Sequence, residues 1–237
     1  AVIFGKKSLE IEPAPQLGGN TIEHPRMMGR AFNLFNLAAN ASDWEGAVRI
    51  YQGASREFGD NLVATEMKRI LRGTLAYYAH DFDSAVEWLE SPESGSLFRS
   101  DRLLLNAYLQ VASDHWKSNE FELALSTAQA AVRLAPEDIL TDYENGMMSY
   151  YNYGMIAAYL VETDLPFQVA DGMPTWQKSL QLFIDHFDKF DGLPDQTLSA
   201  ARQVLTEGVT QKPELLQPDK PDSEEIHSYQ HLIETLN

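Results

Sequence analysis

Two histidines near the end of the chain have the spacing that most suggests chemistry. His227 and His231 are four positions apart, so a helix would place them on one face, with Glu224 one turn before them. Such a group can bind zinc, but no glutamate lies between the histidines to act as the general base of a His-Glu-x-x-His motif. We therefore expect no metal at this position and no cofactor elsewhere in the chain.

Two further histidines have neighbours that occur in catalytic sites. Asp185 precedes His186, a pairing that can transfer protons, but the local sequence supplies no third group to orient it. His115 stands beside Trp116 in an apolar stretch, which favours a packed histidine over a catalytic one. The sequence contains neither a glycine-rich phosphate loop nor a Gly-x-Ser-x-Gly motif. We expect no enzymatic activity, and the catalytic alternative would have to use these histidines and carboxylates.

The 237-residue chain is strongly acidic, with 35 acidic and 18 basic residues and a formal net charge of −17. Such a surface repels phosphate backbones and anionic lipid, so we expect no nucleic-acid partner. The longest apolar run, from Met155 to Val161, is far shorter than a membrane span, which predicts no membrane insertion. The same charge favours a partner segment that is neutral, aromatic or basic.

The chain contains no cysteine, which excludes disulfides, thiolate metal sites and cysteine nucleophiles. This composition is compatible with the cytoplasm and with a bacterial periplasm. Because the first residue is Ala1 and no basic and apolar leader follows, we expect a trimmed or processed form, with removal of a signal or lipoprotein leader as one route. No feature of the sequence favours one oligomeric state over another.

The elements that must position any site are helices, and the stretch from Tyr108 to Pro136 shows them best. Apolar residues at Tyr108, Val111 and Ala112 lie on one face of a helix. After a polar turn, a second helix carries a stripe of small residues that would let the two helices approach closely, formed by Ala124, Ala128 and Ala131. These features predict an antiparallel helical hairpin.

The same pattern recurs along the chain. An aromatic residue is expected to begin the second helix of each hairpin, at Trp44, Phe82 and Phe121. These residues are 38 and 39 positions apart, and each is followed three positions later by an alanine. Met155, followed by Ala158, gives a fourth match. Periods of this length predict stacked supersecondary units that share one continuous core.

These markers resemble the tetratricopeptide repeat (TPR) family. The third unit occupies seven of the positions that mark the family: Tyr108, Val111, Ala112, Ala124, Ala128, Ala131 and Pro136. The second unit matches through Gly73, Ala85 and Leu89 but has Arg69 and Arg72 at usually apolar positions. The resemblance implies an all-α fold, a TPR-like α-solenoid over residues 27–165, with repeats at about 27–60, 66–92, 101–136 and 139–165.

The flanking segments have other patterns. Residues 1–26 contain three prolines and little periodicity, which predicts an extended N-terminal arm. Residues 166–237 predict a C-terminal helical extension that packs on the solenoid, with Thr175 and Asp195 as helix caps. Within it, the three prolines of residues 212–221 predict a linker, and the last helix is expected to cover an exposed end of the solenoid.

In the TPR family, ligands lie in a concave groove lined by the first helix of each unit. The resemblance therefore implies a protein- or peptide-binding adaptor or scaffold without chemistry of its own. Polar and aromatic side chains suit such a groove, and the candidates are Asn36, Asn40, Thr74, Tyr77, Tyr78, Asn106, Ser113, Trp116, Lys117, Tyr143, Tyr150 and Tyr151. The alternative is a cell-envelope helical protein that binds a small molecule in an aromatic-lined pocket formed by the segment Tyr143 to Tyr159 and by Trp176.

Overall fold

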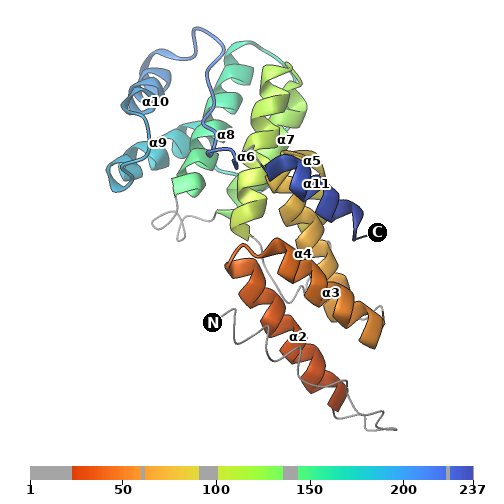
Figure 1. Ribbon diagram of the computed structural model, residues 1–237. Helices are drawn as coiled ribbons and strands as arrows, with labels where there is room; N and C mark the ends of the chain where they lie inside the picture. Colours follow the sequence, from red (N-terminus) through yellow and green to blue (C-terminus); the bar gives the residue numbers. More distant parts are fainter. Residues whose placement is uncertain (1–22, 60–61, 91–100, 136–143, 223–224, 237) are drawn as a thin grey trace. The chain divides into compact units, whose positions relative to one another are not determined.

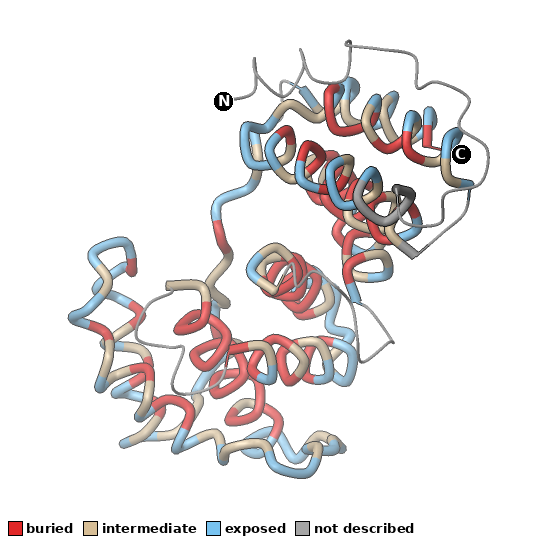
Figure 2. The backbone as a smooth tube through the Cα atoms, turned by 90° about the horizontal axis from the view of Figure 1, so that it is seen from below, coloured by how far each residue is buried: buried red, intermediate tan, exposed pale blue. Residues whose placement is uncertain are grey.

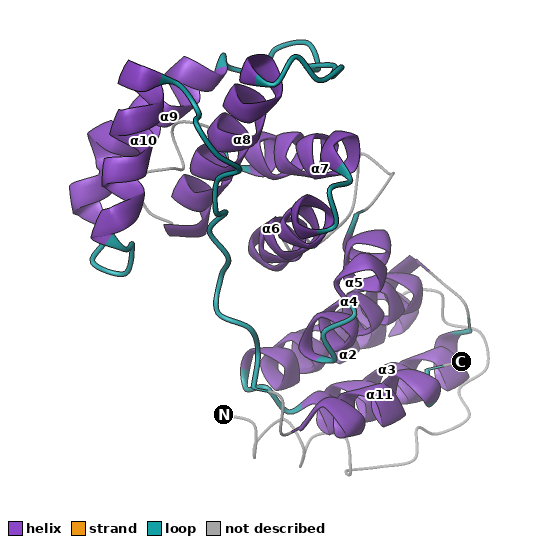
Figure 3. Ribbon diagram, turned by 90° about the horizontal axis from the view of Figure 1, so that it is seen from above, coloured by secondary structure: helices purple, strands orange, loops and turns teal. Residues whose placement is uncertain are grey.

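The computed structural model describes residues 23–59, 62–90, 101–135, 144–222 and 225–236. These residues form helices joined by turns and loops, and no strand occurs among them (Figure 1, Figure 3). The predicted all-α class is therefore confirmed for the described part of the chain. Most of the predicted N-terminal arm lies outside it, and the first described helix begins at Glu23, inside the range predicted to be extended.

The chain divides into two compact units. The first comprises Ala1–Ser100 and Pro221–Asn237, and the second comprises Asp101–Lys220. The predicted boundary between residues 165 and 166 falls inside the second unit, because the helices on either side of it pack on each other.

In the first unit, two helical hairpins pack together and the last helix of the chain joins them. α2 pairs with α3, α4 pairs with α5, and α11 packs on α4 (Figure 1). The sequence predicted instead that the last helix would cover an exposed end. Phe35, Met67 and Leu71 fill the shared core, and Leu236, just beyond α11, belongs to the same apolar cluster. The bounds are α2 Glu23–Asn40, α3 Trp44–Phe58, α4 Leu62–Tyr78, α5 Phe82–Leu89 and α11 Ile226–Glu234.

The second unit also consists of paired helices. α6 pairs with α7, α8 pairs with α9, and α10 packs on α9. The short helix η1 follows α9 directly. The bounds are α6 Asp101–Lys117, α7 Phe121–Leu134, α8 Glu144–Glu162, α9 Trp176–His186, η1 Phe187–Lys189 and α10 Asp195–Glu207.

The expectation that Met155 begins a second helix is wrong. Residues Glu144–Glu162 form one helix, so the predicted repeat at 139–165 supplies only the first helix of a hairpin, and α9 is the second. α8 is buried on nearly all sides, as Tyr153, Met155 and Ile156 illustrate, whereas most other helices alternate between buried and exposed positions (Figure 2). An evenly apolar helix has no periodicity from which its ends can be inferred.

The same turn ends the first helix of each hairpin. Ser42, His80, Asn119 and Asp164 have φ between 54° and 62°, in the left-handed region. In each turn the following residue donates its backbone N–H to the carbonyl five positions earlier, with N···O distances of 2.9 to 3.1 Å. This Schellman arrangement satisfies carbonyls that the helix itself leaves without partners.

Side-chain caps mark some of the helix starts. Asp43 accepts the backbone N–H of Gly46 at 2.9 Å, and Thr175, a predicted cap, accepts that of Lys178 at 3.2 Å. Asp195 is not a cap as predicted, because it is the first residue of α10 and Pro194 holds the cap position. Its carboxylate still lies in the first turn, where the helix dipole favours a negative charge.

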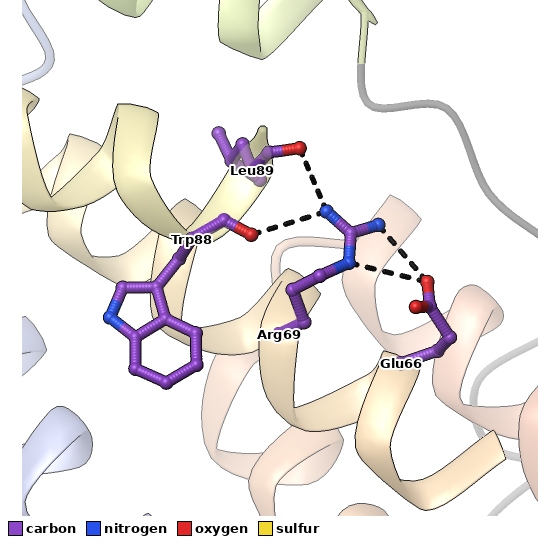
Figure 4. Close-up of polar contacts among 4 residues, drawn as sticks. All are labelled: Glu66, Arg69, Trp88 and Leu89. Atoms are coloured by element: carbon purple, nitrogen blue, oxygen red, sulfur yellow. Dashed lines mark hydrogen bonds and ion pairs between the residues drawn. The ribbon is translucent and has the colours of Figure 1, made fainter. Parts of the chain in front are cut away.

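Arg69 explains one departure from the repeat pattern. Its Nη1 donates to the carbonyls of Trp88 and Leu89 at 3.2 and 2.8 Å, at the C-terminal end of the eight-residue helix α5 (Figure 4). The Arg69 Nη2 and Nε atoms donate to Glu66 Oε2 at 3.0 and 3.3 Å. A charged residue occupies this usually apolar position because it caps the short partner helix while Glu66 balances its charge.

Candidate functional site

After α10 the chain returns as an extended segment along α8 and α6. We call residues 212–220 the strap; it contains no helix, and in Figure 1 it descends beside α8 towards α6. Its prolines Pro213 and Pro218 are buried. The segment connects α10 to α11 without a helix, as expected of a linker, but it is also packed against the unit and bound by side chains of both helices.

Asn152, in the middle of α8, binds the strap most directly. Its Nδ2 donates to the Leu216 carbonyl at 2.7 Å, and its Oδ1 accepts the Leu216 backbone N–H at 2.8 Å. Asn152 is fully buried. One amide thus pairs with the N–H and the C=O of the same residue, as the neighbouring backbone does in a sheet, so it fixes an extended chain without contacting its side chains.

Two residues of α6 donate to other strap carbonyls. Trp116 Nε1 donates to the Pro213 carbonyl at 2.8 Å, and Gln110 Nε2 donates to the Pro218 carbonyl at 2.8 Å. Both side chains are buried. A proline has no N–H, so its carbonyl is the only backbone group that needs a partner when it is buried. The two helices therefore fix the strap at both prolines and at Leu216.

The strap begins with a lysine whose ammonium group lies at the C-terminal end of α6. Lys212 Nζ donates to the Trp116 carbonyl at 2.5 Å and to Asn119 Oδ1 at 2.7 Å. It also lies 5.0 Å from the centre of the Trp116 ring and 5.4 Å from that of the Phe121 ring, within the range of cation–π attraction. We call Trp116, Asn119 and Phe121 the lysine socket.

Tyr151, next to Asn152, adds a weaker contact to the strap. Its hydroxyl lies 3.5 Å from the Glu214 carbonyl oxygen, and its ring packs on Phe183 with centroids 4.9 Å apart. Burial, followed by the charge of the nearby Glu214 carboxylate, raises the pKa of Tyr151 to about 12. The hydroxyl is therefore protonated at neutral pH and serves as a donor, not as a base.

Three of the predicted groove residues contact the strap. These are Trp116, Lys117 and Tyr151, and Lys117 Nζ donates to Gln217 Oε1 at 3.3 Å. The structure thus brings part of the predicted set together around a segment of the same chain.

The other predicted residues of the second unit have different surroundings. Ser113 and Tyr150 are buried. Asn106 accepts a hydrogen bond from Asn145 Nδ2 at 2.6 Å, which joins α6 to α8. Tyr143 lies outside the described residues.

Gln110 and Asn152 also bind the strap backbone, at 2.8 and 2.7 Å, and neither is among the residues expected from the sequence. A side-chain amide within a mostly apolar helix is the signal that indicates such residues, since a buried amide needs a partner. At Asn152 this signal is hidden, because the sequence pattern places a helix boundary near Met155 and Asn152 then lies close to an expected turn, where a polar residue is ordinary.

The predicted groove residues of the first unit divide between its core and its surface. Thr74 and Tyr77 are buried, Asn36 and Tyr78 are half-buried, and Asn40 is exposed at the end of α2.

Tyr78 is covered by the last helix of the chain. Its ring centroid lies 5.5 Å from that of Tyr229 on α11 and 5.5 Å from that of Trp44 on α3. In addition, Gln52 Nε2 donates to the Thr235 carbonyl at 3.2 Å. The C-terminal segment therefore covers a predicted groove residue in this unit too.

The two histidines that suggested zinc chemistry are exposed on α11, and Glu224 lies outside the described residues. Within the part of the chain that the structure describes, no group of three or more histidine, aspartate or glutamate side chains could hold a metal ion. His227 Nδ1 lies 3.3 Å from Gln230 Oε1, and His231 Nδ1 lies 3.7 Å from Glu234 Oε2.

The other two histidines have local partners. His115 Nδ1 lies 2.6 Å from Glu120 Oε2, across the turn between α6 and α7. His186 Nδ1 lies 3.0 Å from the Leu182 carbonyl of its own helix, and the neighbouring Asp185 accepts a hydrogen bond from Gln181 Nε2 at 2.7 Å. Each ring therefore has a hydrogen-bond partner within its own helix or in the adjacent turn.

Comparison of the chain with known protein families, curated proteins and solved structures finds no match to any of them. Among the helices that the structure describes, none is both long enough and apolar enough to cross a membrane.

Proposed function

We propose that this protein is a non-catalytic, TPR-like scaffold that binds an extended peptide segment of a partner protein on the face formed by α6 and α8. The observation that carries the proposal is the pair of hydrogen bonds between Asn152 and the backbone of Leu216. A buried helix side chain that pairs with the N–H and the C=O of one residue is suited to any extended peptide, whatever side chain that residue has.

The arrangement of helices supports the TPR-like part of the proposal. Four hairpins, α2 with α3, α4 with α5, α6 with α7 and α8 with α9, use the same left-handed turn after their first helix. The side-chain donors to the strap backbone lie on α6 and α8, which are first helices of their hairpins. This is the side on which TPR proteins bind ligands.

The charge of the bound segment supports a neutral or basic ligand. The strap contains two lysines and two acidic residues, so its formal charge balances, whereas the whole chain carries −17. Bringing a strongly acidic segment to this surface would add repulsion between like charges. The preference is therefore for neutral or basic segments, in agreement with the expectation from composition.

Selection from a peptide library tests the proposal. A phage-displayed library of random 12-residue peptides would be selected against the full chain carrying Leu216→Pro, which removes the N–H that Asn152 accepts and so loosens the strap. We expect selected peptides that bind this chain and lose at least about tenfold in affinity, about 1.4 kcal/mol, when Asn152→Ala is added.

The controls separate loss of binding from loss of folding. Asn152→Asp keeps the shape and the acceptor but removes the donor, so it should cause a smaller loss than Asn152→Ala. Far-ultraviolet circular dichroism of each variant would verify that the helices remain. Failure to select any binder, or binders that ignore both Asn152→Ala and Trp116→Phe, would refute the proposed site.

A further inference from the structure

We infer that the face of α6 and α8 recognises a lysine–proline pair at the start of the bound segment, and that the strap is an intramolecular ligand which a partner's lysine–proline segment replaces. This inference rests on the proposed function and adds the kind of segment that binds. It comes from the lysine socket and from the two roles of Trp116.

The socket matches an ammonium group in number and kind of contacts. An ammonium has three N–H donors, and Lys212 Nζ directs two hydrogen bonds to the Trp116 carbonyl and Asn119 Oδ1. The faces of Trp116 and Phe121 supply the remaining attraction through their negative ring surfaces. The carbonyls at the end of α6 also carry the partial negative charge of the helix dipole.

The walls of the socket are fixed by packing. The ring centroids of Trp116 and Phe121 are 5.3 Å apart, and those of Trp116 and Tyr159, which comes from α8, are 5.2 Å apart. Phe121 and Tyr159 complete the group at 5.8 Å. A set of three mutually packed rings cannot move singly, so the socket is already formed before a ligand's lysine enters it.

Trp116 also binds the backbone of Pro213, the residue that follows the lysine. Its backbone carbonyl accepts from Lys212 Nζ, while its Nε1 donates to the carbonyl of Pro213. The Pro213 ring is buried, and the absence of an N–H at this position leaves no donor unsatisfied. One tryptophan therefore contacts both residues of the pair, and a proline at the second position adds a buried ring without leaving a backbone N–H to satisfy.

The turn between α4 and α5 in the first unit carries different side chains at these positions. There Tyr77, His80 and Phe82 stand where Trp116, Asn119 and Phe121 stand relative to the left-handed residue of the turn. His80 Nε2 lies 2.8 Å from the Pro221 carbonyl. The lysine socket is defined by the side chains Trp116, Asn119 and Phe121.

The covalent connection makes the strap a strong competitor. A segment joined to its own site has an effective concentration in the millimolar range, so a free peptide of equal intrinsic affinity binds poorly while the strap is in place. Removing the strap's own lysine should open the socket. The same segment supplied in trans should then bind to the opened chain.

Binding of a synthetic strap peptide to the full chain tests the inference. The probe is a fluorescein-labelled peptide of sequence QKPELLQPD, with QAPELLQPD as its matched control, and the receptors are the wild type, Lys212→Ala and Leu216→Pro, compared by fluorescence anisotropy. We expect the lysine peptide to bind either variant at least about tenfold more tightly than it binds the wild type. On Lys212→Ala, in which the strap's own lysine no longer fills the socket, we expect it to exceed the alanine peptide by at least about tenfold, since a charge-assisted hydrogen bond and a cation–π contact are both lost.

Asn119→Gly, added to Lys212→Ala, tests the socket itself. Glycine keeps the left-handed backbone of this turn, where Asn119 has φ 62°, and removes the side chain that carries the Oδ1 acceptor. The variant should reduce the preference for the lysine peptide and leave the affinity for the alanine peptide unchanged.

Each outcome separates this inference from the proposed function. Equal binding of the lysine and alanine peptides would overturn the socket, while the binding of either would still support a peptide-binding face. Equal binding of the lysine peptide to the wild type and to both opened variants would overturn the strap as a competitor. If neither strap peptide binds an opened variant but library peptides do, the inference fails and the proposed function stands.

Discussion

Asn152 and Leu216 are 64 positions apart and exchange two hydrogen bonds, one in each direction between a side-chain amide and a backbone. Asn152 Nδ2 donates to the Leu216 carbonyl, and Asn152 Oδ1 accepts the Leu216 N–H. Because both bonds join the same residue, the strap cannot slide or rotate without breaking both of them. Gln110 makes a less complete contact, because its Oε1 is buried and has no hydrogen-bond partner among the residues that the structure describes. The two amides are chemically alike, but they hold the strap to different extents.

Replacing these amides should therefore have unequal effects. Asn152→Leu removes both bonds and should lower the free energy of unfolding by about 1–3 kcal/mol. Gln110→Met removes one bond but also removes a buried oxygen without a partner, so the change should stay within about 1 kcal/mol. Urea titration gives both values. Amide hydrogen exchange provides a second measurement, and it should accelerate at Leu216 far more in Asn152→Leu than in Gln110→Met.

Arg69 and Glu66 form an ion pair that is largely removed from water, so we expect the loss of one partner to lower the free energy of unfolding. Their side chains are only 12% and 10% exposed, so Arg69→Met leaves a carboxylate in a poorly hydrated place and two α5 carbonyls without their donor. We expect a loss of about 2–4 kcal/mol in the free energy of unfolding. The double variant Glu66→Gln with Arg69→Met should regain part of it. Urea titration of the three proteins tests this, and a double variant less stable than Arg69→Met alone would contradict it.

Part of this architecture could be predicted from the sequence because its signal is local. The apolar spacing around Phe82 and Phe121, together with the polar turns before them, placed the starts of α5 and α7 correctly. The predicted start of a helix at Met155 is wrong, because α8 is one helix that is buried on nearly all sides. Its apolar residues occur at so many positions that Met155 matches the residue expected to begin a second helix. Packing from several sides erases the periodicity on which such a prediction depends.

The candidate site was predictable only in part, for a different physical reason. Trp116 and Lys117 followed from their position on a first helix, but nothing local showed that residues 212–220 would occupy that face. Prolines and the lack of periodicity are equally typical of a free linker and of a bound extended segment. The difference is made by Asn152 and Gln110, whose hydrogen bonds to a distant backbone leave no pattern in the strap sequence.

Two glycines on neighbouring helices should respond oppositely to alanine. At Gly73 an added Cβ would lie 2.4 Å from Leu89 Cγ and 3.3 Å from the Leu89 backbone N, so α4 and α5 would have to separate. Gly53, which is exposed on α3, has no atom within 4 Å of an added Cβ. Gly73→Ala should destabilise the protein by about 1–3 kcal/mol, and Gly53→Ala should stabilise it by about 0.5–1 kcal/mol.

Thermal unfolding of both glycine variants checks this pair. The better helix propensity of alanine favours both substitutions equally, so the difference between them measures the steric contact alone. Combining Gly73→Ala with Leu89→Ala should cost less than the sum of the two single changes, because the side chain that clashes has been removed. Strict additivity would show that the contact at Leu89 is not the cause.

The buried hydroxyl of Tyr151 predicts a loss of stability at high pH. Its pKa is raised from 10.0 to about 12, first by burial and then by the Glu214 carboxylate, so the folded protein keeps this proton over a range in which the unfolded chain releases it. The stabilisation is complete below pH 10 and disappears as the pH rises towards 12. Within this window the contribution should fall by up to about 1.4 kcal/mol for each pH unit.

Tyr151→Phe isolates this contribution from the other tyrosines. The pKa values of Tyr153 and Tyr229 are also raised, so both proteins should lose stability at high pH, but the wild type should lose more. Urea titrations at pH 9, 10 and 11 would measure the difference in free energy of unfolding between the two proteins, which we expect to be constant up to about pH 10 and then to shrink in favour of Tyr151→Phe. A difference that stays constant to pH 11 would mean that Tyr151 ionises as readily in the folded protein as in the unfolded chain, and that the strap does not exclude water from its hydroxyl.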